Sequence, residues 1–279
     1  MPHFDSTGGV RVAAYDFGGD GPPILFAHAT GFHAHVWTPL IGHLRDHFHC
    51  YAFDSRAHGD AITPPEADFA WAGLGDDALA ALDGLGLERP FGVGHSAGGA
   101  ALLLAEADRG GTFRALYCYE PVVPPTDVPL PAGDNPLAIG ALKRRAVFPS
   151  TDAAYEQYSS RGPFTVLRPD TLRAYVDHGF APTSDGEGGV RLKCKPEDES
   201  RMYQKSLAHD AFSKFPTIAC PVTVAYGSET DAIGERLVAA QAERLPQAHA
   251  EELPGLGHFG PLQDPAAVAE SIIRAFTGH

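Results

Sequence analysis

The chain has 279 residues, of which 44% are hydrophobic and 20% charged, a composition typical of one globular domain or of one domain with an insertion. Its 35 acidic side chains outnumber its 21 Lys and Arg, which gives a formal charge of −14, and no basic run is present. This charge pattern disfavours nucleic acid and anionic membranes as partners.

The N-terminal sequence lacks the basic start and apolar stretch of a secretion signal, and no later stretch stays apolar for the roughly 18 residues of a membrane helix. We therefore expect a cytoplasmic protein. Cys50, Cys118, Cys194 and Cys220 are far apart and form no CxxC pair, which indicates reduced core thiols. We expect neither a metal nor a cofactor.

Apolar periodicity predicts alternating strands and helices, and therefore a mainly parallel sheet with helices on both faces. The stretch "PPILFAHA" is continuously apolar, as a buried parallel strand is. The elements in chain order are strands 10–18 and 22–29, helix 36–48, strand 50–54, helix 68–86, strand 90–94, helix 96–109, strand 113–120, strand 221–227, helix 232–245, strand 249–255 and helix 264–277.

This alternation stops between residues 121 and 215. The segment opens with "PVVPPTDVPLPAGDNP", whose prolines disfavour ladders and long helices, and it contains a polar, glycine-rich turn at 183–192. Helical patches follow the prolines, at 137–147, 151–160, 169–179 and 197–208. We therefore predict a helical cap at 121–215, inserted into a core domain made of 1–120 and 216–279.

The stretch "GVGHSAGG" places Ser96 between a predicted strand and a predicted helix. Gly94 and Gly98 lack the Cβ atoms that would clash in such an abrupt turn, and the helix start offers backbone N–H groups to developing negative charge. A serine hydroxyl needs a base, and His258 follows the last predicted strand at the same edge of the sheet. We expect the other histidines, such as His33, His35, His43 and His47, to be solvated polar residues.

The motifs "FAHATGF", "DSRAHG", "GHSAGG" and "GLGHF" occur in an order that resembles the α/β-hydrolase family. The resemblance implies the α/β-hydrolase fold with a nucleophile elbow and an inserted cap. It implies that Ser96 is the nucleophile, that His258 is the general base, and that the backbone N–H groups of Thr30 and Ala97 form the oxyanion hole.

Two motifs depart from the family pattern. Ala29 stands where the family usually has glycine, which leaves the local turn geometry open, and Gly31 is a candidate to compensate. Ala57 likewise stands where the family often has glycine. We interpret the neighbouring Asp54, Arg56 and His58 as loop-bracing residues.

Two residues compete for the acid that orients His258. The usual family position, three residues after the glycine of "VTVAYG", holds Thr230, with Asp231 one place later. A known family alternative puts the acid at the end of the strand after the nucleophile helix, where "YCYEPVV" presents Glu120. We favour Glu120 over Asp231, and sharing between the two stays open.

These residues predict a cofactor-free serine hydrolase that cleaves a carboxylic ester or lactone of a small apolar substrate through an acyl-enzyme. Carbon–carbon bond hydrolysis and perhydrolysis use the same serine layout and stay open. A non-hydrolytic ligand-binding module on the same fold is a further alternative. The expected partner is a small-molecule substrate, and a homodimer is left open.

We interpret the aromatic residues of the predicted cap as packing residues rather than pocket residues. They are Phe148, Tyr155, Tyr158, Phe164 and Tyr175.

Overall fold

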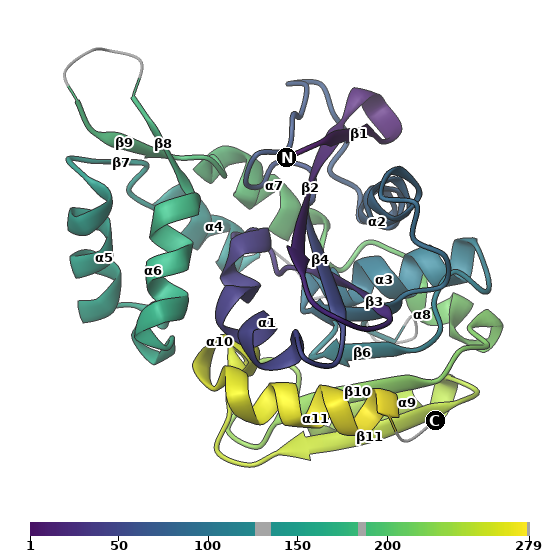
Figure 1. The fold of residues 1–279 in the computed structure, drawn as a ribbon. Coiled ribbons are helices and arrows are strands. Elements are labelled where there is room, and N and C mark those ends of the chain that lie inside the picture. The colour runs from purple at the N-terminus through teal and green to yellow at the C-terminus, as the bar shows by residue number, and fades with distance from the viewer. Residues whose placement is uncertain (126–134, 184–187, 278–279) are drawn as a thin grey trace.

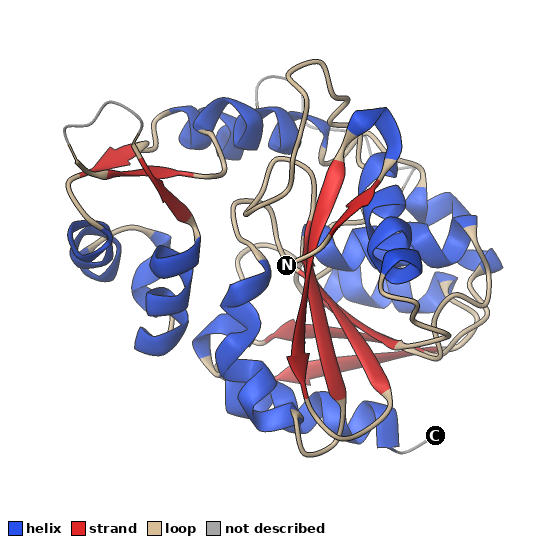
Figure 2. Cartoon of the chain, turned by 45° about the horizontal axis from the view of Figure 1, so that its top comes forward, coloured by secondary structure: helices blue, strands red, loops and turns tan. Residues whose placement is uncertain are grey.

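The computed structural model describes residues 1–125, 135–183 and 188–277 (Figures 1 and 2). Among these residues an eight-stranded sheet has the strand order β1-β2-β4-β3-β5-β6-β10-β11. Neighbours from β4 to β11 pair in parallel, and β1 and β2 form an antiparallel edge. The strands are β1 (His3–Asp5), β2 (Arg11–Gly18), β3 (Pro23–Ala27), β4 (His49–Asp54), β5 (Phe91–His95), β6 (Leu116–Tyr119), β10 (Val222–Gly227) and β11 (Ala248–Leu253).

Helices cover both faces of this sheet, which confirms the predicted fold class. Alternate residues of one strand enter opposite cores: Ile24 and Phe26 of β3 face one layer, and Leu25 and Ala27 face the other. This is why the strand is apolar throughout. One layer holds α1 (Thr38–Leu44), α10 (Gly260–Gln263) and α11 (Pro265–Thr277), and the other holds α2 (Ala72–Gly84), α3 (Ala97–Asp108), α8 (Ala211–Lys214) and α9 (Glu235–Arg244).

Each strand and helix predicted outside residues 121–215 is present, with its ends shifted by a few residues. The short strand β1 was not predicted, because three residues are too few to show an alternating pattern. In the described part of the chain, no helix is both long and apolar enough to cross a membrane.

The segment between β6 and β10, residues 121–215, is called the insert below. The sequence pattern predicted only helices for it, which is incomplete: the insert also contains a second, antiparallel sheet of order β7-β9-β8. This sheet stands to one side of the main sheet with α5 and α6 (Figure 1). The insert comprises α4 (Pro136–Leu142), β7 (Val147–Phe148), α5 (Thr151–Ser160), α6 (Pro169–His178), β8 (Phe180–Pro182), β9 (Val190–Leu192), α7 (Pro196–Lys205) and α8.

Parts of two predicted loops lie outside the described residues: 126–134 of the proline-rich stretch and 184–187 of the glycine-rich turn. Strands β8 and β9 flank the second of these and pair with each other. The division of the chain into a core domain and a cap domain stays a prediction.

The aromatic side chains of the insert pack against one another and against the main body. The Phe164 ring centroid lies 5.0 Å from that of Tyr175 and 5.1 Å from that of Tyr158. It also lies 5.4 Å from that of Phe32, which precedes α1. Aromatic contacts at these distances stabilise the junction between insert and core.

A buried ion pair braces the loop that follows β4. Arg56 donates from Nε and Nη2 to the Asp77 carboxylate of α2, and the two side chains are 3% and 0% exposed. The Arg56 backbone N–H also donates to Asp77. The expected loop-bracing role of Arg56 therefore has a specific partner.

Asp77→Ala should lower the free energy of unfolding by about 3–5 kcal/mol, because it leaves the Arg56 charge buried without its partner. Urea unfolding followed by circular dichroism measures this change. Asp83→Ala is the matched control, because Asp83 pairs with Arg109 at side-chain exposures of 58% and 43%. It should cost less than about 1 kcal/mol. Equal losses in the two variants would contradict this account.

Candidate active site

Ser96 occupies the sharp turn between β5 and α3. Its backbone has φ 54° and ψ −113°, a left-handed conformation that non-glycine residues rarely adopt. Its N–H donates to the Tyr119 carbonyl (2.9 Å), and its carbonyl accepts from the Ala100 N–H (3.2 Å). These bonds hold the strained turn in place.

The two glycines of the motif make room for this turn. A Cβ at Gly94 would lie 2.6 Å from the Gly98 carbonyl carbon, and a Cβ at Gly98 would lie 2.1 Å from the Ala27 carbonyl oxygen. Neither contact is sterically possible. The helix α3 can therefore approach β3 and β5 only with glycine at both positions.

His258 lies on the loop after β11, where its ring meets a buried carboxylate. Its Nδ1 donates to Glu120 Oε2 at 2.7 Å, and the Glu120 side chain is fully buried. A proton on Nδ1 leaves Nε2 with a free lone pair, which is what a general base requires. The structure thus joins two of the predicted residues that lie 138 positions apart.

The Glu120 carboxylate also accepts bonds from the Gly227 N–H (3.1 Å) and the Thr230 hydroxyl (2.8 Å). Thr230, at the position where the family resemblance places the acid, thus donates to the Glu120 carboxylate. Asp231 is exposed, and it makes no hydrogen bond or ion pair with any described residue. The structure therefore brings Glu120, not Asp231, to His258.

Two further side chains hold the loop that carries His258. The buried His95, next to Ser96, binds the His258 carbonyl oxygen through Nε2 at 2.8 Å. Tyr119 donates to the Gly257 carbonyl at 2.8 Å. Neither residue was predicted to take part in the site, although His95 adjoins Ser96 and Tyr119 adjoins Glu120 in the sequence.

The turn after β3 carries the predicted oxyanion residue Thr30. In this turn Gly31 has the left-handed conformation, with φ 84°. The Phe32 N–H donates to the Ala29 carbonyl and so closes the turn. Glycine at position 29 is therefore not needed here. The Gly31 N–H donates to His58 Nε2 at 2.9 Å, so His58 braces this turn as expected.

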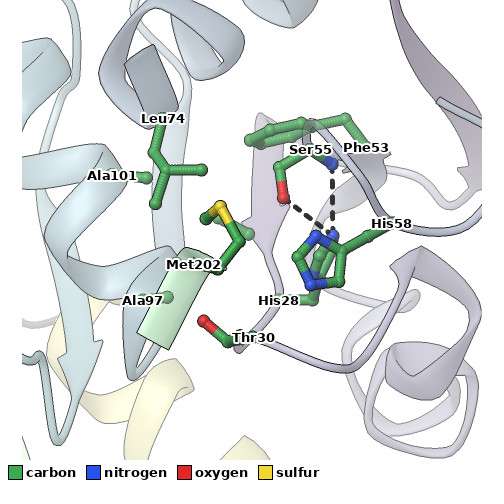
Figure 3. A pocket seen from close by; sticks show the side chains of 11 residues that line it. His28, Thr30, Phe53, Ser55, His58, Leu74, Ala97, Ala101 and Met202 are labelled. Atoms are coloured by element: carbon green, nitrogen blue, oxygen red, sulfur yellow. Dashed lines mark hydrogen bonds between the residues drawn. The ribbon is translucent and has the colours of Figure 1, made fainter. Parts of the chain in front are cut away.

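Thr30 and Ala97 face a common small cavity (Figure 3). The Thr30 N–H makes no hydrogen bond among the described residues, and the Ala97 N–H belongs to the first turn of α3, where amides lack intrahelical acceptors. Two amides are thus available on the residues that sequence analysis predicted for an oxyanion hole.

Residues 24–271 match the family model described as alpha/beta hydrolase family. The chain therefore belongs to the alpha/beta hydrolase family. It is 23% identical to 2-(acetamidomethylene)succinate hydrolase of Mesorhizobium japonicum, over 86% of this chain and 83% of that protein. It is 22% identical to N-formylmaleamate deformylase of Pseudomonas putida, over 93% of this chain and 90% of that protein.

Among solved structures, the crystal structure of E-2-(acetamidomethylene)succinate hydrolase has a TM-score of 0.80, with 21% identity over 99% of this chain and 100% of that one. This likeness shows a shared fold. Together with the family match, the named hydrolases among the relatives support a hydrolase activity for this alpha/beta hydrolase.

Several histidines of this alpha/beta hydrolase are buried and neutral. Burial lowers the pKa of His28 to about 4 and that of His58 to about 3. The prediction that His33 is solvated was wrong: it is 3% exposed, and burial holds its pKa well below the usual value. His35 is half-buried, whereas His43 and His47 are exposed as predicted.

Ala57 has φ 68°, a left-handed conformation that favours glycine, the residue that the family resemblance leads us to expect there. The described residues contain no group of three or more His, Cys, Asp or Glu side chains arranged to hold a metal ion.

His58→Gln should flatten the pH dependence of stability. In the unfolded chain His58 binds a proton near pH 6.5, but the folded pKa is about 3, so acidification between these values favours unfolding. Replacing His58 should reduce the slope of unfolding free energy between about pH 6 and pH 4 by about 1.4 kcal/mol per pH unit. Urea titrations at several pH values measure it. His43→Gln, at an exposed site, is the control, and an unchanged slope in His58→Gln would refute the assignment.

Proposed function

We propose that the protein is a serine hydrolase that cleaves a carboxylic ester or lactone of a small apolar substrate through an acyl-enzyme. The observation that carries this proposal is the 2.7 Å bond from His258 Nδ1 to the buried Glu120, at the edge of the sheet where Ser96 begins α3. In the proposal Ser96, His258 and Glu120 are the catalytic residues.

In the first step, Ser96 Oγ attacks the substrate carbonyl carbon while His258 Nε2 accepts the serine proton. Negative charge develops on the carbonyl oxygen, and the N–H groups of Thr30 and Ala97 stabilise it. The Glu120 carboxylate keeps His258 in the required tautomer and stabilises the imidazolium. The ester C–O bond then breaks, and His258 gives its proton to the leaving alcohol.

In the second step, His258 takes a proton from water, and the hydroxide attacks the acyl carbon. The bond to Ser96 breaks, the serine recovers its proton, and the carboxylic acid leaves. The insert would act as the cap that bounds the substrate site. Carbon–carbon bond hydrolysis and perhydrolysis by the same residues stay alternatives, and product analysis with each substrate class separates them.

A small molecule is the proposed partner, whereas a cytoplasmic location and a homodimer stay predictions. The non-hydrolytic alternative is tested by the first experiment below.

A fluorophosphonate should label the wild-type protein covalently at Ser96, because the probe reacts with activated serines. Ser96→Ala should abolish both the labelling and ester hydrolysis, with turnover falling by several orders of magnitude. Mass spectrometry of the labelled peptide and a p-nitrophenyl acetate assay measure the two effects. Ser159→Ala, on the exposed surface of α5, is the matched control. Absence of labelling in the wild type would favour the ligand-binding module.

Glu120→Gln should lower turnover by a factor on the order of 10⁴, because the amide can no longer stabilise the histidinium. Asp231→Asn should stay near wild type, because this side chain is exposed and makes no hydrogen bond with Glu120 or His258. Both variants keep side-chain volume, so a difference in kcat reports charge and hydrogen bonding rather than side-chain size. A larger loss in Asp231→Asn would reverse the assignment of the acid.

A further inference from the structure

The small cavity beside the nucleophile turn lies on one particular side of Ser96. It is bounded by His28 at the end of β3 and by Phe53 and Ser55 at the end of β4. In the sheet, β3 and β4 lie on one side of β5, whereas β6, β10 and β11 lie on the other. Glu120 and His258 follow strands of that second group. The cavity and His258 therefore lie on opposite sides of Ser96.

This placement decides which part of a substrate can enter the cavity. The leaving group must lie next to His258, which protonates it. The carbonyl oxygen must lie at the amides of Thr30 and Ala97, both of which contact the cavity. The remaining substituent of the carbonyl carbon, the acyl chain, is then directed toward the cavity.

The cavity is small, and two bulky side chains bound part of it. Leu74 of α2 and Met202 of α7 bound it, and they are 2% and 1% exposed (Figure 3). Met202 is anchored because its carbonyl accepts a bond from the buried Trp71 indole N–H at 3.0 Å. The insert thus contributes one wall of the cavity, and this wall cannot retreat freely from a long chain.

One polar atom in the cavity lacks a partner. Thr30 Oγ1 is buried and makes no hydrogen bond, and the residue is only 5% exposed. Figure 3 shows this hydroxyl directed toward Met202 and Ala97. An unsatisfied buried hydroxyl is costly, and a bound carbonyl group would satisfy it.

We infer that this cavity is the acyl subsite and that it selects short acyl groups of about the size of acetyl. This inference rests on the proposed serine-hydrolase function and adds the class of substrate to it. An extra methylene that a small pocket cannot accommodate costs roughly tenfold or more in specificity.

The test is kcat/KM for the p-nitrophenyl esters of acetate, butyrate and hexanoate. In the wild type, acetate should exceed hexanoate by at least about tenfold. Met202→Ala opens the cavity, so it should raise kcat/KM for hexanoate and narrow this ratio by about tenfold. If Met202→Ala does not fold, Leu74→Ala shortens another side chain that lines the cavity and gives the same test.

Leu172→Ala is the matched control, because Leu172 is equally buried but lies on α6 in the other core layer. It should leave the ratio unchanged. If Ser96 is labelled by a fluorophosphonate but hexanoate is preferred, or if the ratio is the same in Met202→Ala as in wild type, the acyl-subsite inference is wrong and the hydrolase function stands. If Ser96 is not labelled and no ester is cleaved, both fail.

Discussion

The buried carboxylate of Glu120 is the constraint on which the site depends. A charge without solvent needs donors, and Glu120 finds them on the Gly227 N–H, the Thr230 hydroxyl and His258 Nδ1. Its own N–H donates to the Ala225 carbonyl, and its φ of 45° turns the chain sharply after β6. Satisfying this single charge therefore fixes the ends of β6 and β10 and the loop after β11 relative to one another.

The strained turn at Ser96 is coupled to the same place. Its N–H is bound by the Tyr119 carbonyl, one residue before Glu120, so the two left-handed residues Ser96 and Glu120 stand side by side at the ends of paired strands. Each of these two strained backbone conformations costs on the order of 1–3 kcal/mol of folding free energy. The sheet hydrogen bonds and the two apolar layers that enclose β5 and β6 offset this cost, which shows why such strain occurs at the centre of the sheet.

The sequence predicted the sheet and the site where the signal was local. Ser96 and its glycines lie within eight residues, and continuous apolar strands show in any short window. Motif positions favoured Glu120 over Asp231, but no local pattern shows the bond that joins Glu120 to His258 across 138 positions. The burial of His33 and the sheet β7-β9-β8 were missed for similar reasons: a polar residue in a loop and strands of two or three residues carry no periodic signal.

The oxyanion turn is held from two sides, by the core and by the insert. From the core, the Nε2 of neutral His58 accepts the Gly31 N–H, while its Nδ1 donates to the Arg56 carbonyl, and burial lowers the pKa of His58 and so favours this neutral form. From the insert, Glu199 of α7 approaches so closely that a Cβ at Gly31 would lie 2.7 Å from its Oε1. Arg144 neutralises this carboxylate. Glycine at position 31 thus serves both the backbone conformation and the docking of the insert, so the packing of the insert and the direction of the Thr30 amide depend on each other.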